Sequence, residues 1–314
     1  MNNDNSIKTI GKVIGFIGIM SLYTMLGIYY MPIFLLLLPF PFIVIGVKNK
    51  AFYGILSMIV TFLIISFVEG KEWALYLLFS YLPLTFTLTY TIAKRRKPIE
   101  ILGYSSAAFF LSGLLILNFA DTSSGINLVT MLENTFKQML ALQVDIFRDM
   151  GFTSYEILSR KDYLEEVYRY ILLIIPAILM ITSLIISYTN YFLCAITLRR
   201  FGIGIVNVPR FSKFRLPNNI IPGTIVMFLA TIVIKQLNFP YYDTIAINLI
   251  SIIGFMFFIQ GLAVMDYLLN KLRVKLLLRI IFLTILIAPL STVMPLIGLA
   301  DLLFDVRKLR KLKS

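Results

Sequence analysis

The sequence contains no histidine and a single cysteine, Cys194, among its 314 residues. Histidine and cysteine supply most ligands of zinc and other first-row transition metals, and histidine is the base in Ser-His-Asp and Cys-His catalysis. Sites of these kinds are therefore disfavoured, and we expect no cofactor and no metal ion. Cys194 lies inside an apolar run, where we expect it to be a small core or lipid-facing residue.

Charged residues are also scarce, because they make up only 14% of the chain while 59% of its residues are hydrophobic. Soluble domains carry nearly twice this charged fraction. Apolar runs of about 18 to 25 residues recur along the sequence, and this is the length that a helix needs to cross a hydrocarbon layer. The composition therefore predicts an all-α protein, a polytopic integral membrane helix bundle.

Hydropathy predicts eight clear spans and a C-terminal membrane hairpin. The spans are expected at residues 10–30, 32–47, 51–68, 73–93, 99–120, 170–198, 220–236 and 244–269. The last apolar stretch, 276–304, contains Pro289 and Pro295 midway, which favours a hairpin of two half-depth arms or two tilted crossings. The expected domains are an N-terminal bundle of five spans (1–120), an extracytoplasmic amphipathic helical segment (121–169) and a C-terminal membrane bundle with a basic loop and tail (170–314).

The distribution of charge predicts the side of the membrane on which each loop lies. With a cytoplasmic N-terminus, 22 of the 29 lysines and arginines fall on the cytoplasmic side and 11 of the 16 acids fall outside. Cytoplasmic loops retain lysine and arginine, so we expect a multi-pass bacterial plasma-membrane protein with both termini in the cytoplasm. The same rule and an attraction to anionic lipid headgroups explain the net charge of +13 without nucleic-acid binding.

Residues 121–169 form the one long polar segment between predicted spans. Apolar residues recur within it at steps of three and four, as in an amphipathic helix. They are Leu128, Leu132, Phe136, Met139, Leu140, Val144, Phe147 and Met150. Gly151 is placed to end this helix, and Thr153 and Glu156 have capping-box spacing for the next one. We expect a helical hairpin that either rests passively on the membrane or serves as a lid or a docking surface for an envelope partner.

No charged residue occupies the centre of a predicted span, which argues against a proton- or ion-coupled carrier. Uncharged polar side chains do occur at depth and are candidates for binding a ligand. These candidates are Asn190, Gln260, Tyr188, Tyr191, Thr85 and Thr89. Thr85 and Thr89 lie one helical turn apart and so share a face. Such residues can simply form hydrogen bonds between helices, or they can line a small-molecule cavity.

The stretch NVPRFSKFRLPNN, residues 207–219, separates the sixth and seventh predicted spans. Pro209 and Pro217 disfavour helix at the residues before them, so the segment is expected to be extended or to form a turn. Its candidate residues for contact with lipid or a partner on the cytoplasmic side are Arg210, Phe211, Lys213, Phe214 and Arg215. Rings and cations alternate here, which suits the lipid headgroup layer.

Two other interpretations of this basic loop remain open. It can bind a cytosolic partner or an anionic ligand, or it can clamp the C-terminal hairpin through the acids Asp266, Asp301 and Asp305. The three acids could instead hold Mg²⁺. Arg307 and Lys308 offer two of them a simpler partner, so we expect no enzymatic activity.

Two segments, VPRFSKFRLPNN at 208–219 and GLADLLFDVRKLR at 298–310, resemble recurring elements of the YybS-like family of bacterial membrane proteins. The span pattern, the length and the long outer loop are similar too. That family resembles distantly the substrate-binding subunits of energy-coupling-factor vitamin transporters and the rod-shape membrane protein MreD. The resemblance implies a shared fold and fixes no ligand, so no binding residue is transferred.

Two functions follow as expectations. The polar residues at depth and the lid-like outer hairpin favour a small-molecule-binding or transport subunit. The lack of intramembrane charge and the two polar faces favour a non-catalytic envelope scaffold, or a partner protein in cell shape, division or sporulation. Membrane lipids, including anionic headgroups, and other membrane or envelope proteins are the expected partners, and nucleic acid is not.

Overall fold

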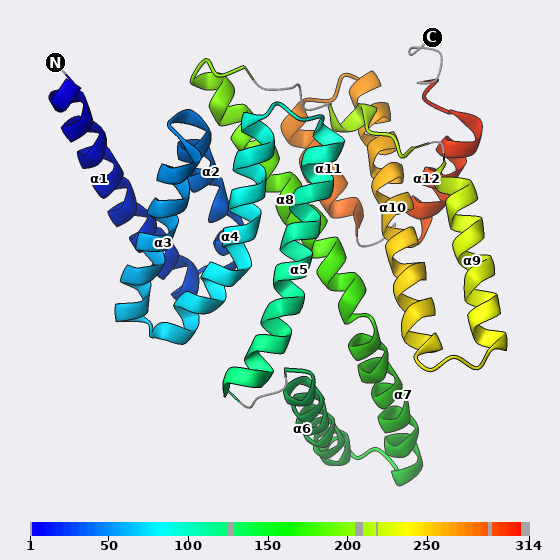
Figure 1. Cartoon of the computed structure of the whole chain (residues 1–314). Coiled ribbons are helices and arrows are strands. Elements are labelled where there is room, and N and C mark those ends of the chain that lie inside the picture. The colour runs from blue at the N-terminus through cyan, green and yellow to red at the C-terminus, as the bar shows by residue number, and fades with distance from the viewer. Residues whose placement is uncertain (1, 125–127, 205–209, 218, 288–290, 309–314) are drawn as a thin grey trace. The chain divides into compact units, whose positions relative to one another are not determined.

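The computed structural model describes residues 2–124, 128–204, 210–217, 219–287 and 291–308 (Figure 1). Every regular element in these residues is a helix, which confirms the all-α class. The elements are α1 (Asn2–Tyr29), η1 (Pro32–Leu37), α2 (Pro39–Lys48), α3 (Ala51–Val68), α4 (Lys71–Ala93), α5 (Pro98–Ser124), α6 (Leu128–Asp149), α7 (Ser154–Leu173), α8 (Ile175–Arg200), η2 (Phe211–Lys213), α9 (Ile220–Gln236), α10 (Tyr242–Lys271), α11 (Leu276–Ile287) and α12 (Val293–Phe304).

Among the described residues, five helices are long and apolar enough to cross a membrane: α3, α4, α5, α8 and α10. Shorter apolar helices stand at the other predicted spans, in α1, in η1 with α2, and in α9. The protein is therefore a membrane protein of several apolar helices. The number of crossings and the placement of the α6–α7 hairpin outside the membrane stay predictions.

The last apolar stretch forms two helices, α11 and α12, of 12 residues each. At 1.5 Å per residue each one is about 18 Å long, well short of the ~30 Å hydrocarbon layer. Figure 1 shows α11 running down the view and α12 running back up. Pro289 lies outside the described residues, and Pro295 is in the first turn of α12, where proline is tolerated.

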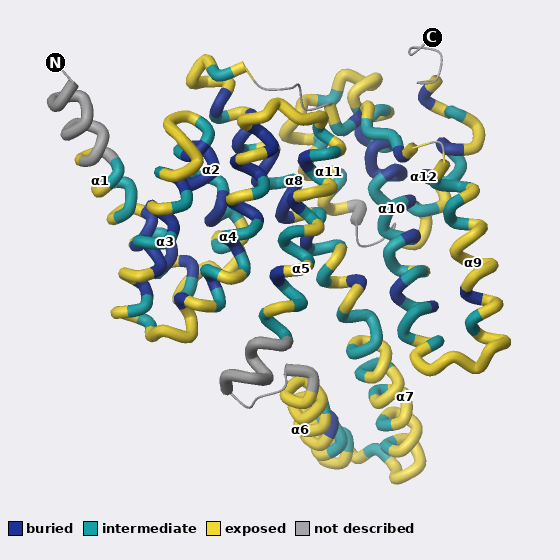
Figure 2. Tube along the Cα trace, in the orientation of Figure 1, coloured by how far each residue is buried: buried dark blue, intermediate teal, exposed yellow. Residues whose placement is uncertain are grey.

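The helices form two compact units. Unit 1 contains Met1–Thr135 and Thr182–Val208, and unit 2 contains Phe136–Ile181 and Pro209–Ser314. The core of unit 1 is a cluster of large apolar side chains, most of them from α2, α3, α4 and α8. The buried stretches of these helices are dark blue in Figure 2. Its fully buried members include Leu38, Phe42, Met58, Leu84, Leu88, Tyr191 and Leu198. Helices α2 and α3 approach closely at Gly46 and Gly54, where a Cβ on Gly54 would lie 2.8 Å from the Gly46 Cα.

Unit 2 is organised around α10, and α12 packs along it. This packing needs two glycines, since a Cβ on Gly261 would overlap the Met294 carbonyl and a Cβ on Gly298 would overlap the Phe257 carbonyl. Helix α9 also contacts α10, yet most of its apolar side chains are exposed. Such a surface is expected for a helix that faces lipid.

The predicted span at 170–198 is interrupted, because α7 ends at Leu173 and α8 begins at Ile175. Pro176 has no backbone N–H, so the helix cannot continue its hydrogen bonds through it. Asn248 of α10 bridges the interruption. Its side-chain oxygen accepts from the Ala177 N–H at 2.6 Å, and its side-chain nitrogen donates to the Leu173 carbonyl at 2.7 Å. Asn248 thereby joins α7, α8 and α10.

The α6–α7 hairpin has the local signals that its sequence predicts. Gly151 ends the α6 region in the left-handed conformation, with φ of 80°. Thr153 and Glu156 form a reciprocal capping box at the start of α7. The Phe136 and Tyr168 rings stack with their centroids 4.7 Å apart, which holds the two helices together. In Figure 1 α6 is seen almost along its axis and α7 lengthwise, so they cross at a steep angle.

Candidate functional site

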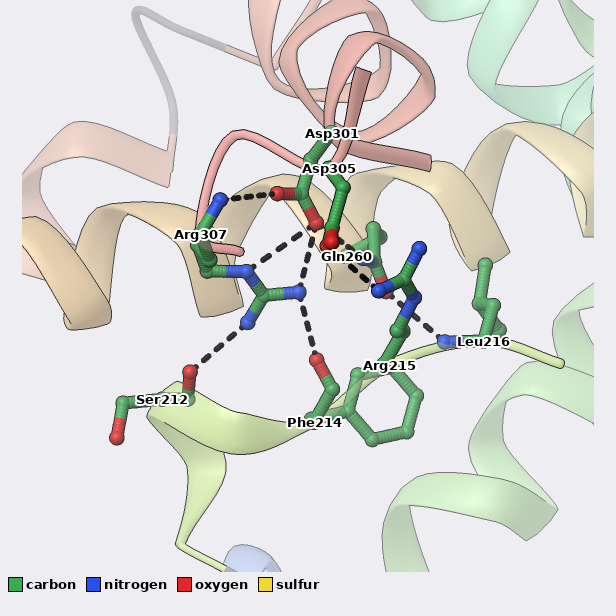
Figure 3. A network of polar contacts seen from close by, with 8 residues as sticks. All are labelled: Ser212, Phe214, Arg215, Leu216, Gln260, Asp301, Asp305 and Arg307. Atoms are coloured by element: carbon green, nitrogen blue, oxygen red, sulfur yellow. Dashed lines mark hydrogen bonds and ion pairs between the residues drawn. The ribbon is translucent and has the colours of Figure 1, made fainter. Parts of the chain in front are cut away.

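Arg307 is the centre of a polar network that joins the basic loop to the end of α12 (Figure 3). Its guanidinium is almost fully buried, and it donates through Nε and Nη2 to Asp301 Oδ2 at 3.1 and 2.8 Å. The remaining donors reach backbone carbonyls of the loop, those of Ser212 at 2.8 Å and Phe214 at 2.9 Å. One side chain thus ties α12 to residues 210–217.

Gln260 of α10 completes this network between the loop and α12 (Figure 3). Its Nε2 donates to Asp301 Oδ2 at 2.7 Å, and its Oε1 accepts from the Leu216 N–H at 3.0 Å. Both ends of the amide are therefore used within unit 2. The structure places Gln260 in this network, where its oxygen and its nitrogen each bond to a residue of the loop or α12.

A second ion pair lies beside the first, between Arg215 and Asp305 at 2.6 Å. Both side chains are mostly buried, and Asp305 has a left-handed backbone with φ of 49°, which ends α12. Arg210 and Lys213 of the loop are exposed, while Phe211 and Phe214 are half-buried with their rings stacked 6.4 Å apart. The loop itself contains a short helical turn, η2, between extended residues.

We refer to Arg215, Gln260, Asp301, Asp305 and Arg307 as the C-terminal clamp. The third candidate acid, Asp266, lies apart from it and pairs with Arg279 of α11 at 3.5 Å. A buried charge is tolerated when it is paired and its hydrogen-bonding groups are satisfied, as those of Asp301 and Arg307 are. The contacts of Asp301 and Arg307 within the protein thus account for their burial. Among the described residues no group of three metal-ligating side chains occurs, so the three acids do not gather into a cation site.

The other candidate residues lie in unit 1, and most of them contain buried polar atoms without partners, as Arg215 of the clamp does at Nε and Nη2. Thr85 and Thr89 on α4 and Asn190 and Tyr191 on α8 are each at most 1% exposed. The two threonine hydroxyls, the Asn190 side-chain oxygen and the Tyr191 hydroxyl make no hydrogen bond to a described residue. Ser187, one turn before Tyr191, is buried with an unpaired hydroxyl as well.

Buried hydroxyls elsewhere in unit 1 behave differently, because they donate to the carbonyl four residues earlier in the same helix. The residues that do so are Ser21, Thr24, Ser57, Thr61, Thr91, Ser105 and Ser112. This local bond is the usual solution for serine and threonine inside a helix. Thr85, Thr89 and Ser187 do not use it, although their helices offer it.

Helices α4 and α8 both contact the segment formed by η1 and α2, through Thr89, Asn190 and Cys194. Thr89 lies against Gly46 of α2, where a glycine Cβ would be 3.3 Å from the threonine hydroxyl. From the other helix, Asn190 donates to the Leu36 carbonyl of η1 at 2.9 Å, and the Cys194 thiol lies 3.6 Å from the Phe40 carbonyl of α2. We call Thr85, Thr89, Ser187, Asn190 and Tyr191 the hydroxyl–amide set. Tyr188 is on another face of α8, half-buried and stacked on Phe192.

Comparison with known proteins identifies the family of the chain. Residues 17–302 match the family described as Predicted membrane protein (DUF2232). The chain belongs to this family. A stretch of 178 residues is also 22% identical to a protein of Bacillus subtilis (strain 168) named Uncharacterized protein YybS, and the match covers 57% of each chain. The predicted YybS-like resemblance is thus confirmed. No solved structure matches the chain.

The part of the chain that matches the family includes the whole hydroxyl–amide set and reaches Asp301 of the clamp. Asp305 and Arg307 lie after the matched residues. Sequence reasoning missed Ser187 and Asn248. A proline inside an apolar run, Pro176, was the signal that a buried side chain such as that of Asn248 had to supply the lost hydrogen bonds.

Proposed function

We propose that this membrane protein is a binding or transport subunit for a small, uncharged, polar molecule held by the hydroxyl–amide set of unit 1. The observation that supports this most directly is the group of buried polar atoms without partners. Buried polar groups in proteins are almost always hydrogen-bonded, and an unpaired one costs about 1–3 kcal/mol. Several such atoms on two helices, α4 and α8, are accounted for when a bound molecule supplies the missing bonds.

The chemistry of the set defines the class of ligand. Hydroxyls both donate and accept, and the Asn190 side-chain oxygen accepts, so the set can bind alcohol, amide or carbonyl groups. Where the structure describes the side chains of unit 1, none of the buried ones belongs to lysine, arginine, aspartate or glutamate, so a charged ligand would meet no opposite charge among them. Placing an uncompensated charge in such a core is costly, and a neutral solute is favoured.

The proposal is tested on α4 with two pairs of threonines. Thr85→Val/Thr89→Val removes unpaired hydroxyls, and Thr87→Val/Thr91→Val is the matched control, because those hydroxyls bond to Pro83 and Thr87 carbonyls at 2.7 Å. Each protein is purified gently and denatured, and released small molecules are identified by mass spectrometry. We expect one neutral solute from the wild type and the control variant, and none from Thr85→Val/Thr89→Val.

Stability gives an independent readout of the same variants. If the hydroxyls have no partner, replacing both with methyl groups raises the free energy of unfolding, by about 1–3 kcal/mol for each. If a solute is bound, the variant loses its mass-action stabilisation, about 2.7 kcal/mol when the solute is at 100 times its dissociation constant. A stabilised Thr85→Val/Thr89→Val variant, together with no solute released from the wild type, would contradict the proposal.

A second candidate function, an envelope scaffold, is favoured by the surface of α6. Part of its apolar surface contacts α7, as in the Phe136–Tyr168 stack, and another part is exposed. The exposed apolar side chains are Met131, Leu132, Met139, Leu142, Ile146 and Met150, at 40–67% exposure. Methionine-rich faces adapt to different partner surfaces.

Photocrosslinking in growing cells tests this alternative. A benzoylphenylalanine is placed at Leu142 or Met150 on the exposed apolar face, and at Asn134 on the polar face as the control. A scaffold predicts one and the same protein crosslinked from Leu142 and Met150 but not from Asn134. Adducts with lipid alone from both positions would count against a scaffold and would place the face on the membrane.

A further inference from the structure

Three chain segments of unit 1 that are far apart in sequence meet at one edge of the unit. They are the end of α2 with residues 48–50, the end of α4 with residues 94–97, and the end of α8 with residues 199–204 (Figure 1). The Lys48 ammonium lies 3.9 Å from the centre of the Phe201 ring, which joins the first segment to the third. The Arg95 guanidinium lies 3.7 Å from the position of a Cβ on Gly204, which joins the second to the third.

The local backbone exposes the side chains of these segments. Helix α4 ends with Arg95 in the left-handed conformation, and the Arg96 N–H bonds to the Thr91 carbonyl at 3.1 Å. Helix α8 ends in the same way at Gly202, where the Ile203 N–H bonds to the Leu198 carbonyl at 3.0 Å. Both are Schellman-type ends, which satisfy the last carbonyls with backbone groups and leave the side chains free to point outward.

The edge is strongly basic. Its eight cations are Lys48, Lys50, Lys94, Arg95, Arg96, Lys97, Arg199 and Arg200, and all are exposed. One acid, Glu100, stands beside them and pairs with Arg96 at 3.7 Å. Each helix C-terminus contributes a partial charge of about −0.5. With Glu100, these three ends and the starts of α3 and α5 at the same edge, the net positive charge is about six.

Aromatic rings lie among the cations. Besides Phe201 under Lys48, the Tyr90 ring lies 5.2 Å from the Lys94 ammonium. An exposed ring beside an exposed cation is suited to the boundary between headgroups and acyl chains, where the ring enters the apolar layer and the cation meets phosphate. A small ion in water would contact the cations but would leave the exposed rings unburied. We call this surface the basic edge.

We propose that the basic edge of unit 1 binds the headgroups of anionic phospholipids, and that it recognises their phosphodiester charge. Lysine ammonium groups and arginine guanidinium forks from three segments can contact several phosphate oxygens at once. The site is distinct from the loop at residues 210–217. In that loop Arg215 is already paired with Asp305, and Arg307 bonds to two of the loop carbonyls. Anionic lipid is thus placed at residues 48–50, 94–97 and 199–204.

The test removes one cation from each segment at once, in the variant Lys50→Gln/Lys97→Gln/Arg200→Gln. The side chains of these three residues make no hydrogen bond or ion pair to another described residue, so the fold is expected to persist. The matched control is Arg210→Gln/Lys213→Gln/Lys275→Gln, which removes three exposed cations of unit 2. Thermal unfolding midpoints of both variants are measured first.

Binding is measured on full-length purified protein with fluorescent phosphatidylglycerol and with phosphatidylcholine of the same acyl chains. We expect the wild type and the control variant to bind phosphatidylglycerol about tenfold more tightly than phosphatidylcholine. Since each cation near a membrane surface contributes a factor of about five, the basic-edge variant is expected to lose this preference. The preference should also fall in 1 M salt, where charges are screened beyond about 3 Å.

The possible results separate the alternatives. Equal affinity of the wild type for the two lipids overturns the proposal. It is also overturned if the control variant loses the preference as fully as the basic-edge variant, since the effect would then be one of total charge. Displacement of the labelled phosphatidylglycerol by millimolar inorganic phosphate would assign the edge to a free anion and would likewise reject a lipid site.

Discussion

Gly298 of α12 lies so close to Gly261 of α10 that a Cβ on Gly298 would be 2.8 Å from the Gly261 backbone nitrogen. The two helices therefore meet backbone to backbone at this point. Close approach of this kind is how small residues strengthen helix pairs in membranes, where dispersion and short-range contacts replace the hydrophobic effect between helices.

We first predict that Gly261→Ala and Gly298→Ala each destabilise unit 2 by about 1–3 kcal/mol or more, because the added methyl overlaps a carbonyl of the facing helix. Gly254→Ala, on α10 like Gly261, is the control, since nothing lies within 4 Å of its Cβ position. It should be neutral or stabilising by up to about 1 kcal/mol. Reversible unfolding in mixed detergent measures all three. Equal effects at Gly254 and Gly261 would contradict the close packing.

The second prediction concerns the clamp. Arg307→Met leaves Asp301 buried without its ion partner, and the expected loss of stability is about 3–5 kcal/mol. Arg307→Lys should also be destabilising, because a lysine cannot reach Asp301 and two loop carbonyls with one planar fork. The measurement is thermal unfolding together with proteolysis of the 210–217 loop.

A double change provides the control for the clamp. Asp301→Leu combined with Arg307→Met removes both charges, so it should cost less than Arg307→Met alone. If the double variant is as unstable as the sum of the single variants, then the two residues do not interact in the protein, which would contradict the 2.8 Å ion pair.

Asn248 gives the third prediction. Asn248→Leu keeps the branched shape of the side chain but removes bonds to Ala177, Leu173 and Thr244, so the ends of α7 and α8 lose their partners. The expected cost is about 1–3 kcal/mol, and amide hydrogen exchange at Ala177 should become faster. Exchange that rises equally throughout α10 would show a general loss of stability instead of a loss at this interruption.

The fourth prediction is a pH dependence at the start of α7. The hydrogen bond from the Thr153 backbone N–H, and then that from the Thr153 hydroxyl, lowers the pKa of Glu156. A lowered folded-state pKa means that the carboxylate stabilises the capping box above its unfolded pKa of about 4.3. That contribution is lost as the pH falls through the lower folded value.

Amide exchange at residues 153–157, corrected for its intrinsic rate, should therefore be constant from neutral pH to about pH 5 and should rise in acid. Glu156→Gln retains an oxygen that accepts the Thr153 N–H but cannot titrate, so its corrected exchange should be independent of pH in this window. A pH dependence that persists in Glu156→Gln would assign the effect to another group.

Local patterns in the sequence predicted local structure well. Helices α3 and α9 have the bounds expected from hydropathy, and Gly151, Thr153 and Glu156 form the turn and cap that their spacing indicated. These features depend on neighbouring residues, and the energetic preferences that produce them act over one or two helical turns. The interruption at Pro176 was not predicted, because the hydropathy of a stretch of residues does not depend on whether one of them lacks a backbone N–H.

The candidate site depended on contacts between distant residues and was only partly predictable. Gln260 bonds to Asp301 and to Leu216, which are 41 and 44 residues away, so its place in the clamp could not be read from its surroundings in the sequence. Whether a buried polar side chain is satisfied depends on such pairs. The unpaired hydroxyls of Thr85 and Thr89 could be recognised only by comparison with Thr91 on the same helix.

The clamp also has a consequence for the order of events during biosynthesis. Arg307 follows Ser212 by 95 residues, and the ribosome must make all of them before the carbonyl of Ser212 meets its donor. Until then the loop that precedes α9 lacks the hydrogen bonds that join it to Arg307. The second unit consequently matures only when its last helix has arrived, and a nascent chain stopped short of Arg307 presents quality-control proteases with an open loop and an unneutralised Asp301.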